Sequence, residues 1–204
     1  MRINLPNQIT LGRLVLAIIF FGLLARYDHR TPSPGLLDVC LVLFIIAAAT
    51  DALDGYLARR QNQVTSLGRV LDPFVDKVLI CGVFVFFASG RFFDAAGRNA
   101  AGIQAWMVVL ILGRELLVTG LRGFSESQGQ SYAAAFSGKL KMFLQSITAG
   151  VILFVVARAD GGIPAQPWLG IQTGLVWATV VVTTLSMVQY LIRSKHILAE
   201  ASRP

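Results

Sequence analysis

Six long apolar segments, separated by stretches rich in Gly, Pro and charged residues, divide this 204-residue chain. A helix that crosses a bilayer needs roughly 20 apolar residues, and its backbone polar groups must be paired within the helix. We therefore predict an all-α fold, an integral membrane bundle of six transmembrane helices that forms a single domain over residues 1–204. The expected spans, of which the third is the shortest, are 9–25, 36–57, 74–88, 103–121, 140–157 and 169–192.

The composition agrees with a membrane protein and argues against a nucleic-acid partner. Only 14% of the residues are charged and 55% are hydrophobic, whereas soluble domains have roughly 25% charged residues. The formal net charge of +7 is spread between the apolar segments rather than concentrated in one basic patch. Membrane topology and anionic ligands explain such a distribution better than nucleic acid does. Cys40 and Cys81 each lie inside an apolar segment without zinc-type spacing, which favours buried small residues.

The distribution of Lys and Arg predicts the orientation of the bundle. If the N-terminus is cytoplasmic, 13 of the 18 basic residues fall on the cytoplasmic side, which satisfies the positive-inside tendency. Both termini are then cytoplasmic. The five basic residues on the opposite side are Arg26, Arg30, Arg91, Arg98 and Arg158.

An acidic motif links the second and third segments. It reads D-x2-D-G-x2-A-R-x8-G-x3-D-x3-D, and its residues are Asp51, Asp54, Gly55, Ala58, Arg59, Gly68, Asp72 and Asp76. Spacings of three, four and eight residues place the members of each half on one helix face. Carboxylates at the edge of a bilayer are costly and tend to mark function. Two facing helices with paired carboxylates form an all-oxygen site that suits divalent cations such as Mg²⁺.

Structural explanations exist for single members of this motif. Asp72 could cap the third helix with Pro73 in its first position. Gly and Ala also allow membrane helices to pack closely, and Arg59 could extend toward the membrane surface. A solvated charge cluster would account for the set as a whole, but it gives no reason for the spacing.

A second charged group lies in the fourth and fifth segments. Arg114 and Arg122 are eight residues apart, so they can share a broad helix face, and Lys139 and Lys141 begin the fifth segment. Only Glu115 balances them, as a partner of Arg114 or by orienting a neighbour. Four cations suggest a pocket for a phosphate-bearing acceptor, while ordinary positive-inside charge is the alternative.

The acidic motif resembles, in every residue and spacing, the signature of the CDP-alcohol phosphotransferase family, whose six-helix membrane fold agrees with the segment count. The resemblance implies two divalent metal ions, Mg²⁺ or Mn²⁺, and a homodimer. It implies that Asp76 is the base that deprotonates the acceptor alcohol. The metal ligands would be Asp51, Asp54, Asp72 and Asp76. The residues implied to bind CDP-diacylglycerol are Asp54, Gly55, Ala58, Arg59 and Gly68.

The basic segments resemble the branch of this family that makes phosphatidylglycerophosphate, with R-E-x6-L-R followed by G-K-x-K and a downstream Gln. Residues 4–13 and a segment around Ser186 and Tyr190 resemble that branch too, and Met142 departs from it where many members have Thr. The implied acceptor is sn-glycerol 3-phosphate, with CMP as the second product and the bacterial plasma membrane as the location. The implied acceptor contacts are Arg13, Arg114, Arg122, Lys139 and Lys141.

Other functions stay open at this point. Inositol phosphate would suit the same cations, serine has no phosphate and would explain them less well, and phosphatidylglycerol is a further alternative acceptor. A cation transporter also places carboxylates in the membrane, but it predicts inverted repeats and access from both faces. The sequence has no repeat, and its motif carboxylates all lie toward one face. A structural scaffold would leave these carboxylates without a purpose.

Overall fold

The computed structural model describes the backbone of residues 5–33, 35–61, 66–127, 136–162 and 166–201. Within these ranges, some side chains lie outside the description. They are those of residues 5–7, 9, 51–61, 66–72, 126, 136–137, 139 and 194–201.

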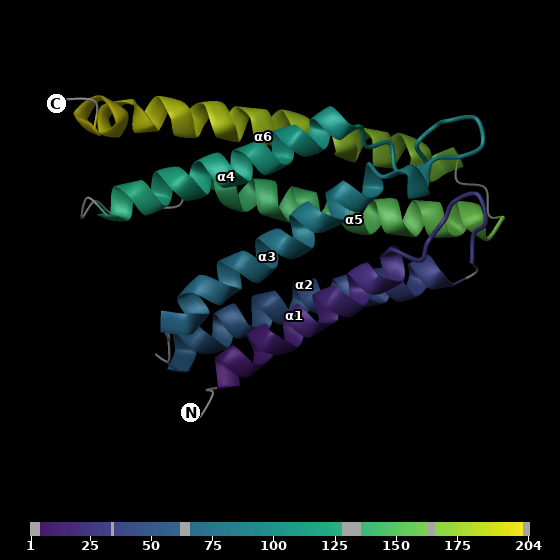
Figure 1. Cartoon of the computed structure of the whole chain (residues 1–204), viewed down its shortest axis with the longest axis horizontal. Coiled ribbons are helices and arrows are strands. Elements are labelled where there is room, and N and C mark those ends of the chain that lie inside the picture. The colour runs from purple at the N-terminus through teal and green to yellow at the C-terminus, as the bar shows by residue number, and fades with distance from the viewer. Residues whose placement is uncertain (1–4, 34, 62–65, 128–135, 163–165, 202–204) are drawn as a thin grey trace.

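Six α-helices make up the described chain, and consecutive helices run back and forth along one long axis (Figure 1). The first residues of α1, α3 and α5 and the last residues of α2, α4 and α6 lie at the same end of the bundle, on the left of Figure 1, where the two termini are marked. The described part contains no β-strand beyond one isolated bridge between Phe93 and Asn99. The helices are α1 (Leu5–Leu24), α2 (Leu36–Gln61), α3 (Ser66–Phe87), α4 (Ala105–Ser127), α5 (Phe136–Asp160) and α6 (Gln166–Ala201).

The all-α prediction is confirmed, and each of the six expected segments coincides with one helix to within two residues at the ends where it extends beyond it. Two of them, Leu140–Asp160 and Gln166–Arg193, are long and apolar enough on their own to cross a membrane, among the residues described. Thr10–Leu24 and Leu36–Thr50 are shorter apolar stretches. Charged residues of the two motifs interrupt the remaining helices, so six spans stay a prediction.

The start of α3 differs from the expectation, and the capping explanation for Asp72 is wrong. The helix begins at Ser66, so Asp72 and Pro73 lie two turns inside it. Proline has no N–H, and it therefore removes one intrahelical hydrogen bond at this point. The Asp-Pro pair resembles a helix start locally, but here the helix continues through it.

The helices pack around a core of aromatic and aliphatic side chains, and one glycine is required by the packing. A Cβ atom on Gly82 of α3 would lie 2.4 Å from the ring of Phe21 on α1. The Phe21 ring stacks on Phe86 with centroids 5.6 Å apart. Any side chain at residue 82 would therefore require the Phe21 ring to shift from its position between α1 and α3.

The outer surface of the bundle is rich in large apolar side chains. Leu116 is 74% exposed, Val109 69% and Phe143 65%, on helices α4 and α5. Exposed apolar side chains this numerous are unusual in a water-soluble monomer. They are typical of helices that face lipid, as expected for a membrane protein. Cys40 and Cys81 are buried and free, in agreement with the sequence interpretation.

Candidate active site

The backbone places the acidic motif on two consecutive helices at the end that holds both termini. Asp51 and Asp54 lie in the last part of α2, and Asp72 and Asp76 lie in the first half of α3. Of the four carboxylates, only that of Asp76 is among the described side chains. The convergence of the four around metal ions therefore stays a prediction. The side chains of Gly55, Ala58, Arg59 and Gly68 lie outside the described residues as well.

Asp76 forms an ion pair with Arg13 of α1. Arg13 Nη1 lies 2.5 Å from Asp76 Oδ1, and the arginine side chain is 1% exposed whereas the carboxylate is 27% exposed. The buried arginine fixes the position of the carboxylate, since a charge-assisted hydrogen bond is strongly directional. The sequence assigned Arg13 to the acceptor, but the structure brings it to the predicted base. The partly exposed carboxylate is a hard oxygen donor, so it fits a ligand of Mg²⁺ or Mn²⁺.

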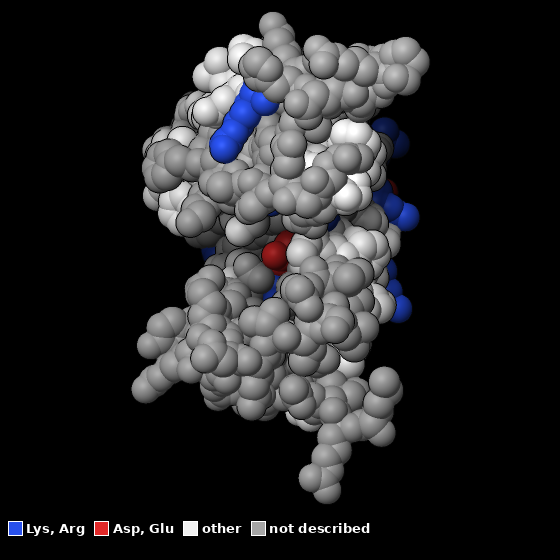
Figure 2. All heavy atoms as spheres, turned by 90° about the vertical axis from the view of Figure 1, so that its left-hand side faces the viewer, with Lys and Arg blue, Asp and Glu red and all other residues white. Residues whose placement is uncertain are grey.

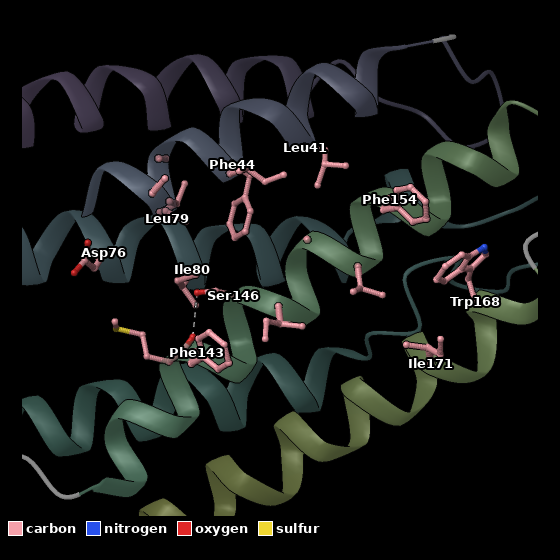
Figure 3. A pocket seen from close by; sticks show the side chains of 18 residues that line it. Leu41, Phe44, Asp76, Leu79, Ile80, Phe143, Ser146, Phe154, Trp168 and Ile171 are labelled. Atoms are coloured by element: carbon pink, nitrogen blue, oxygen red, sulfur yellow. Dashed lines mark hydrogen bonds between the residues drawn. The ribbon is translucent and has the colours of Figure 1, made fainter. Parts of the chain in front are cut away.

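A cavity of about 1000 Å³ extends from Asp76 between α2, α3, α5 and α6 (Figure 3). Among the residues that the structure describes, Asp76 is the one charged residue that lines it, and nearly all of the others are apolar. On α5 the lining runs from Met142 to Phe154, twelve residues or about 18 Å along the helix. This exceeds one leaflet of the hydrocarbon core, about 15 Å. The length and the apolar lining of this cavity match a long apolar chain.

Met142, the departure from the branch pattern, lines this apolar cavity. The neighbouring residue on the chain, Lys141, is buried and contacts Glu115 instead of the cavity lining. The thioether therefore extends the apolar surface beside the charged residues. A hydroxyl at this position would contribute a polar group to the cavity instead.

A buried charged cluster joins α4 to α5 and α6. Glu115 accepts a hydrogen bond from Arg114 Nη1 at 3.0 Å and a close one from Lys141 Nζ. Arg114 Nη2 also donates to the hydroxyl of Ser186 at 2.7 Å. Arg114 and Lys141 are each 4% exposed. Burial of charges is costly unless they are paired, so Glu115 is the group that allows both cations to be buried here.

Tyr190 of α6 connects this cluster to Arg122. The guanidinium of Arg114 lies over the Tyr190 ring, 5.2 Å from its centroid. Arg122 Nη2 donates to the Tyr190 hydroxyl at 3.3 Å. The structure thus brings together three of the predicted acceptor residues, Arg114, Arg122 and Lys141. Lys139, the fourth cation of this segment, has its side chain outside the described residues.

Several polar atoms around this cluster are buried without a hydrogen-bond partner. They include Nε of Arg114 and of Arg122, both amide atoms of Gln145 and the hydroxyl of Thr183. An unpaired buried donor or acceptor costs about 1–3 kcal/mol. Atoms that stay unpaired at this cost point to a bound water or ligand in the complete site. Viewed toward this end of the molecule, acidic and basic atoms lie deep between the helices (Figure 2).

Reasoning from the sequence did not assign functions to Ser186 and Tyr190 and did not predict the cavity. The two residues are one turn apart in an otherwise apolar helix, and polar residues with that spacing share one face. This spacing was the available signal. The cavity left no such signal, because the apolar residues that line it do not differ in sequence from those that face lipid.

Comparison with known proteins identifies the family. Residues 3–185 match the family model described as CDP-alcohol phosphatidyltransferase. A Bacillus subtilis protein is 39% identical over 159 residues, 74% of this chain and 76% of its own length. Proteins of Sodalis glossinidius (31%, covering 98% and 100%) and Yersinia pestis (32%, covering 94% of each) are similar over nearly the whole chain. All three carry the name CDP-diacylglycerol–glycerol-3-phosphate 3-phosphatidyltransferase. This chain belongs to the CDP-alcohol phosphatidyltransferase family.

Proposed function

We propose that this protein transfers the phosphatidyl group of CDP-diacylglycerol to sn-glycerol 3-phosphate and releases CMP. The relatives that carry the name of this activity support the proposal. The observation in the structure that supports it most is the cationic cluster of buried Arg114 and Lys141 with half-buried Arg122, in which two Nε–H donors are unpaired. With Glu115 as the counter-ion, three cations leave two positive charges, which match a phosphate dianion.

The donor occupies the apolar cavity and the acidic motif in this proposal. An acyl chain of CDP-diacylglycerol lies along α5, and the activated phosphate lies near Asp76 at the end of the cavity. The groups proposed to bind the nucleotide and the diphosphate come from the motif. They are Asp54, Gly55, Ala58, Arg59 and Gly68.

The four motif carboxylates are proposed to hold two divalent metal ions, Mg²⁺ or Mn²⁺. Their all-oxygen chemistry and the partial exposure of Asp76 support this assignment. Bound metal ions would neutralise the diphosphate and stabilise the negative charge that develops during phosphoryl transfer. The proposed ligands are Asp51, Asp54, Asp72 and Asp76.

Asp76 is proposed to accept the proton of the acceptor hydroxyl. The hydroxyl oxygen then forms a bond to the phosphorus that carries the diacylglycerol, and the bond between that phosphorus and the CMP oxygen breaks. Arg13 holds the carboxylate in place throughout. A positioned base of this kind contributes roughly 100- to 10,000-fold to the rate. The cationic cluster holds the phosphate of the acceptor, so that the hydroxyl is presented to the base.

The same proposal sets the protein in the bacterial plasma membrane as six spans forming one domain over residues 1–204. Both termini and the active site face the cytoplasm, where CMP is released, and two copies form a homodimer. The shared location of the termini and the acidic motif at one end of the bundle supports this arrangement (Figure 1). The positive-inside tendency supports the cytoplasmic assignment of that end.

The test is an assay of CMP release by the purified protein with CDP-diacylglycerol and Mg²⁺. Glycerol 3-phosphate, inositol phosphate, serine and phosphatidylglycerol are offered separately, and a chelator is added in a parallel series. We expect CMP release with glycerol 3-phosphate, loss of release with the chelator and recovery on adding Mg²⁺. Release with inositol phosphate alone would overturn the acceptor assignment, and release that is indifferent to the chelator would overturn the metal assignment.

A further inference from the structure

Tyr190 is the residue on α6 that contacts both arginines of the cationic cluster. Arg114 and Arg122 are eight residues apart on α4, a rise of about 12 Å along the helix. The Tyr190 ring lies under the Arg114 guanidinium at 5.2 Å, and its hydroxyl accepts from Arg122 at 3.3 Å. The tyrosine is 1% exposed. One rigid side chain therefore contacts two arginines that lie about two turns apart on a neighbouring helix.

The contact on the other side of Tyr190 restrains it further. A Cβ atom added to Gly138 of α5 would lie 3.4 Å from the Tyr190 hydroxyl and 3.7 Å from Arg114 Nη2. The backbone of α5 thus lies directly against the same two groups. A Cβ atom at residue 138 would already be in van der Waals contact with the Tyr190 hydroxyl, so little space is left for a larger side chain. Tyr190 is held between α4 and α5.

We propose that Tyr190 is a positioning residue for the acceptor phosphate, acting through Arg114 and Arg122; this inference rests on the proposed function. A flexible arginine loses side-chain entropy when it is fixed on a ligand. Tyr190 fixes both guanidinium groups before the ligand binds, and their Nε–H donors stay unpaired. Ser186, one turn earlier, restrains Arg114 in the same way. The ring supplies a cation–π contact and the hydroxyl a hydrogen bond, so neither phenylalanine nor serine replaces tyrosine completely.

The test compares Tyr190→Phe and Tyr190→Leu with the wild type. The phenylalanine variant keeps the ring under Arg114 and loses the hydrogen bond from Arg122. We expect it to raise KM for glycerol 3-phosphate about tenfold, the effect of one hydrogen bond to a charged group. KM for CDP-diacylglycerol and kcat should change by less than about twofold, and inorganic phosphate should inhibit about tenfold more weakly. The leucine variant, which loses both contacts, should raise KM for the acceptor further.

Tyr27→Phe is the matched control, since it also removes one phenol hydroxyl from a buried tyrosine, here at the opposite end of the bundle. It should leave both KM values unchanged. The inference is overturned if Tyr190→Phe is folded with an unchanged KM for the acceptor, or if it changes the KM of donor and acceptor equally. Absence of wild-type turnover with glycerol 3-phosphate would instead contradict the proposed function. In that case the role of Tyr190 is tested in the reaction with another acceptor. Inorganic phosphate should inhibit Tyr190→Phe more weakly than the wild type.

Discussion

The two ends of the helix bundle differ in how completely the polar contacts of their described side chains are made. At the end opposite the termini, Tyr27 donates to Asp160 Oδ2 at 2.8 Å and His29 lies 3.0 Å from Asp160 Oδ1. The amide group of Asn99 bonds the backbone oxygens of Phe87 and Ile103. Burial and the bond to Asp160 raise the pKa of the Tyr27 phenol, so it stays a donor. These contacts close the loops between helices.

At the end that holds the termini, the charged groups are only partly satisfied. Arg114, Arg122, Gln145 and Thr183 all keep buried atoms without a partner, whereas the other end has one such atom, on Gln172, among the described residues. A purely structural network would pay this free-energy cost without benefit. We interpret the complete network as one that stabilises the fold and the incomplete one as suited to binding a ligand. The following changes test this contrast.

The largest effect is expected for Asp76→Asn. The amide keeps an oxygen for Arg13 but cannot accept the proton of the acceptor, so kcat should fall by roughly 100- to 10,000-fold. CMP release under saturating substrates measures it. Asp38→Asn, which alters the ion pair with Arg158 far from the site, is the control and should retain activity. Wild-type activity in Asp76→Asn would rule out this base.

Lys141→Met should have the next largest effect. The substitution removes one of the buried cations and leaves Glu115 with Arg114, so KM for glycerol 3-phosphate should rise about 10- to 100-fold. Initial rates at varied acceptor and fixed donor give this value. Arg158→Met removes one cation at the opposite end and should leave KM unchanged. A rise confined to the KM of CDP-diacylglycerol would contradict the acceptor site.

Asp160→Ala should lower stability without changing the kinetics. It removes the partner of both Tyr27 and His29, which should cost about 1–3 kcal/mol and lower the Tm in detergent. Thermal unfolding followed by circular dichroism measures the loss. If kcat/KM instead fell with no change in Tm, the opposite end would have to be considered part of the active site.

The smallest effect is expected for Asp94→Asn in the α3–α4 connection. Backbone N–H groups of Arg98 and Ala96, with the Arg98 side chain, lower the pKa of Asp94 below its usual range. A carboxyl group whose pKa is lower in the folded protein stabilises the fold at pH values above its ordinary pKa of about 3.9. This contribution is lost as the pH falls through the lower, folded-state pKa. The variant should therefore have a slightly lower Tm at neutral pH. If the Tm difference between the wild type and Asp94→Asn increased as the pH was lowered, the assignment would be contradicted.

The sequence predicted the helices well because apolar length is a local property. It predicted the wrong start for α3 because an Asp-Pro pair has the same local pattern at a helix start and inside a helix. The cationic cluster was predicted in part, since Arg114 and Arg122 share one helix and their spacing is informative. The ion pair of Arg13 with Asp76 joins residues 63 positions apart. No spacing rule predicts such a contact, because it depends on how α1 crosses α3.

The proposed function depends most on the cationic cluster, which must act only on the phosphate of the acceptor. The direct measurement compares kcat/KM for glycerol 3-phosphate with that for glycerol, in the wild type and in Arg114→Ala, at fixed CDP-diacylglycerol and Mg²⁺. We predict that the wild type prefers the phosphate-bearing acceptor by at least about 100-fold, and that Arg114→Ala loses most of this preference while its reaction with glycerol is unchanged. A variant that slows both acceptors equally would contradict the account.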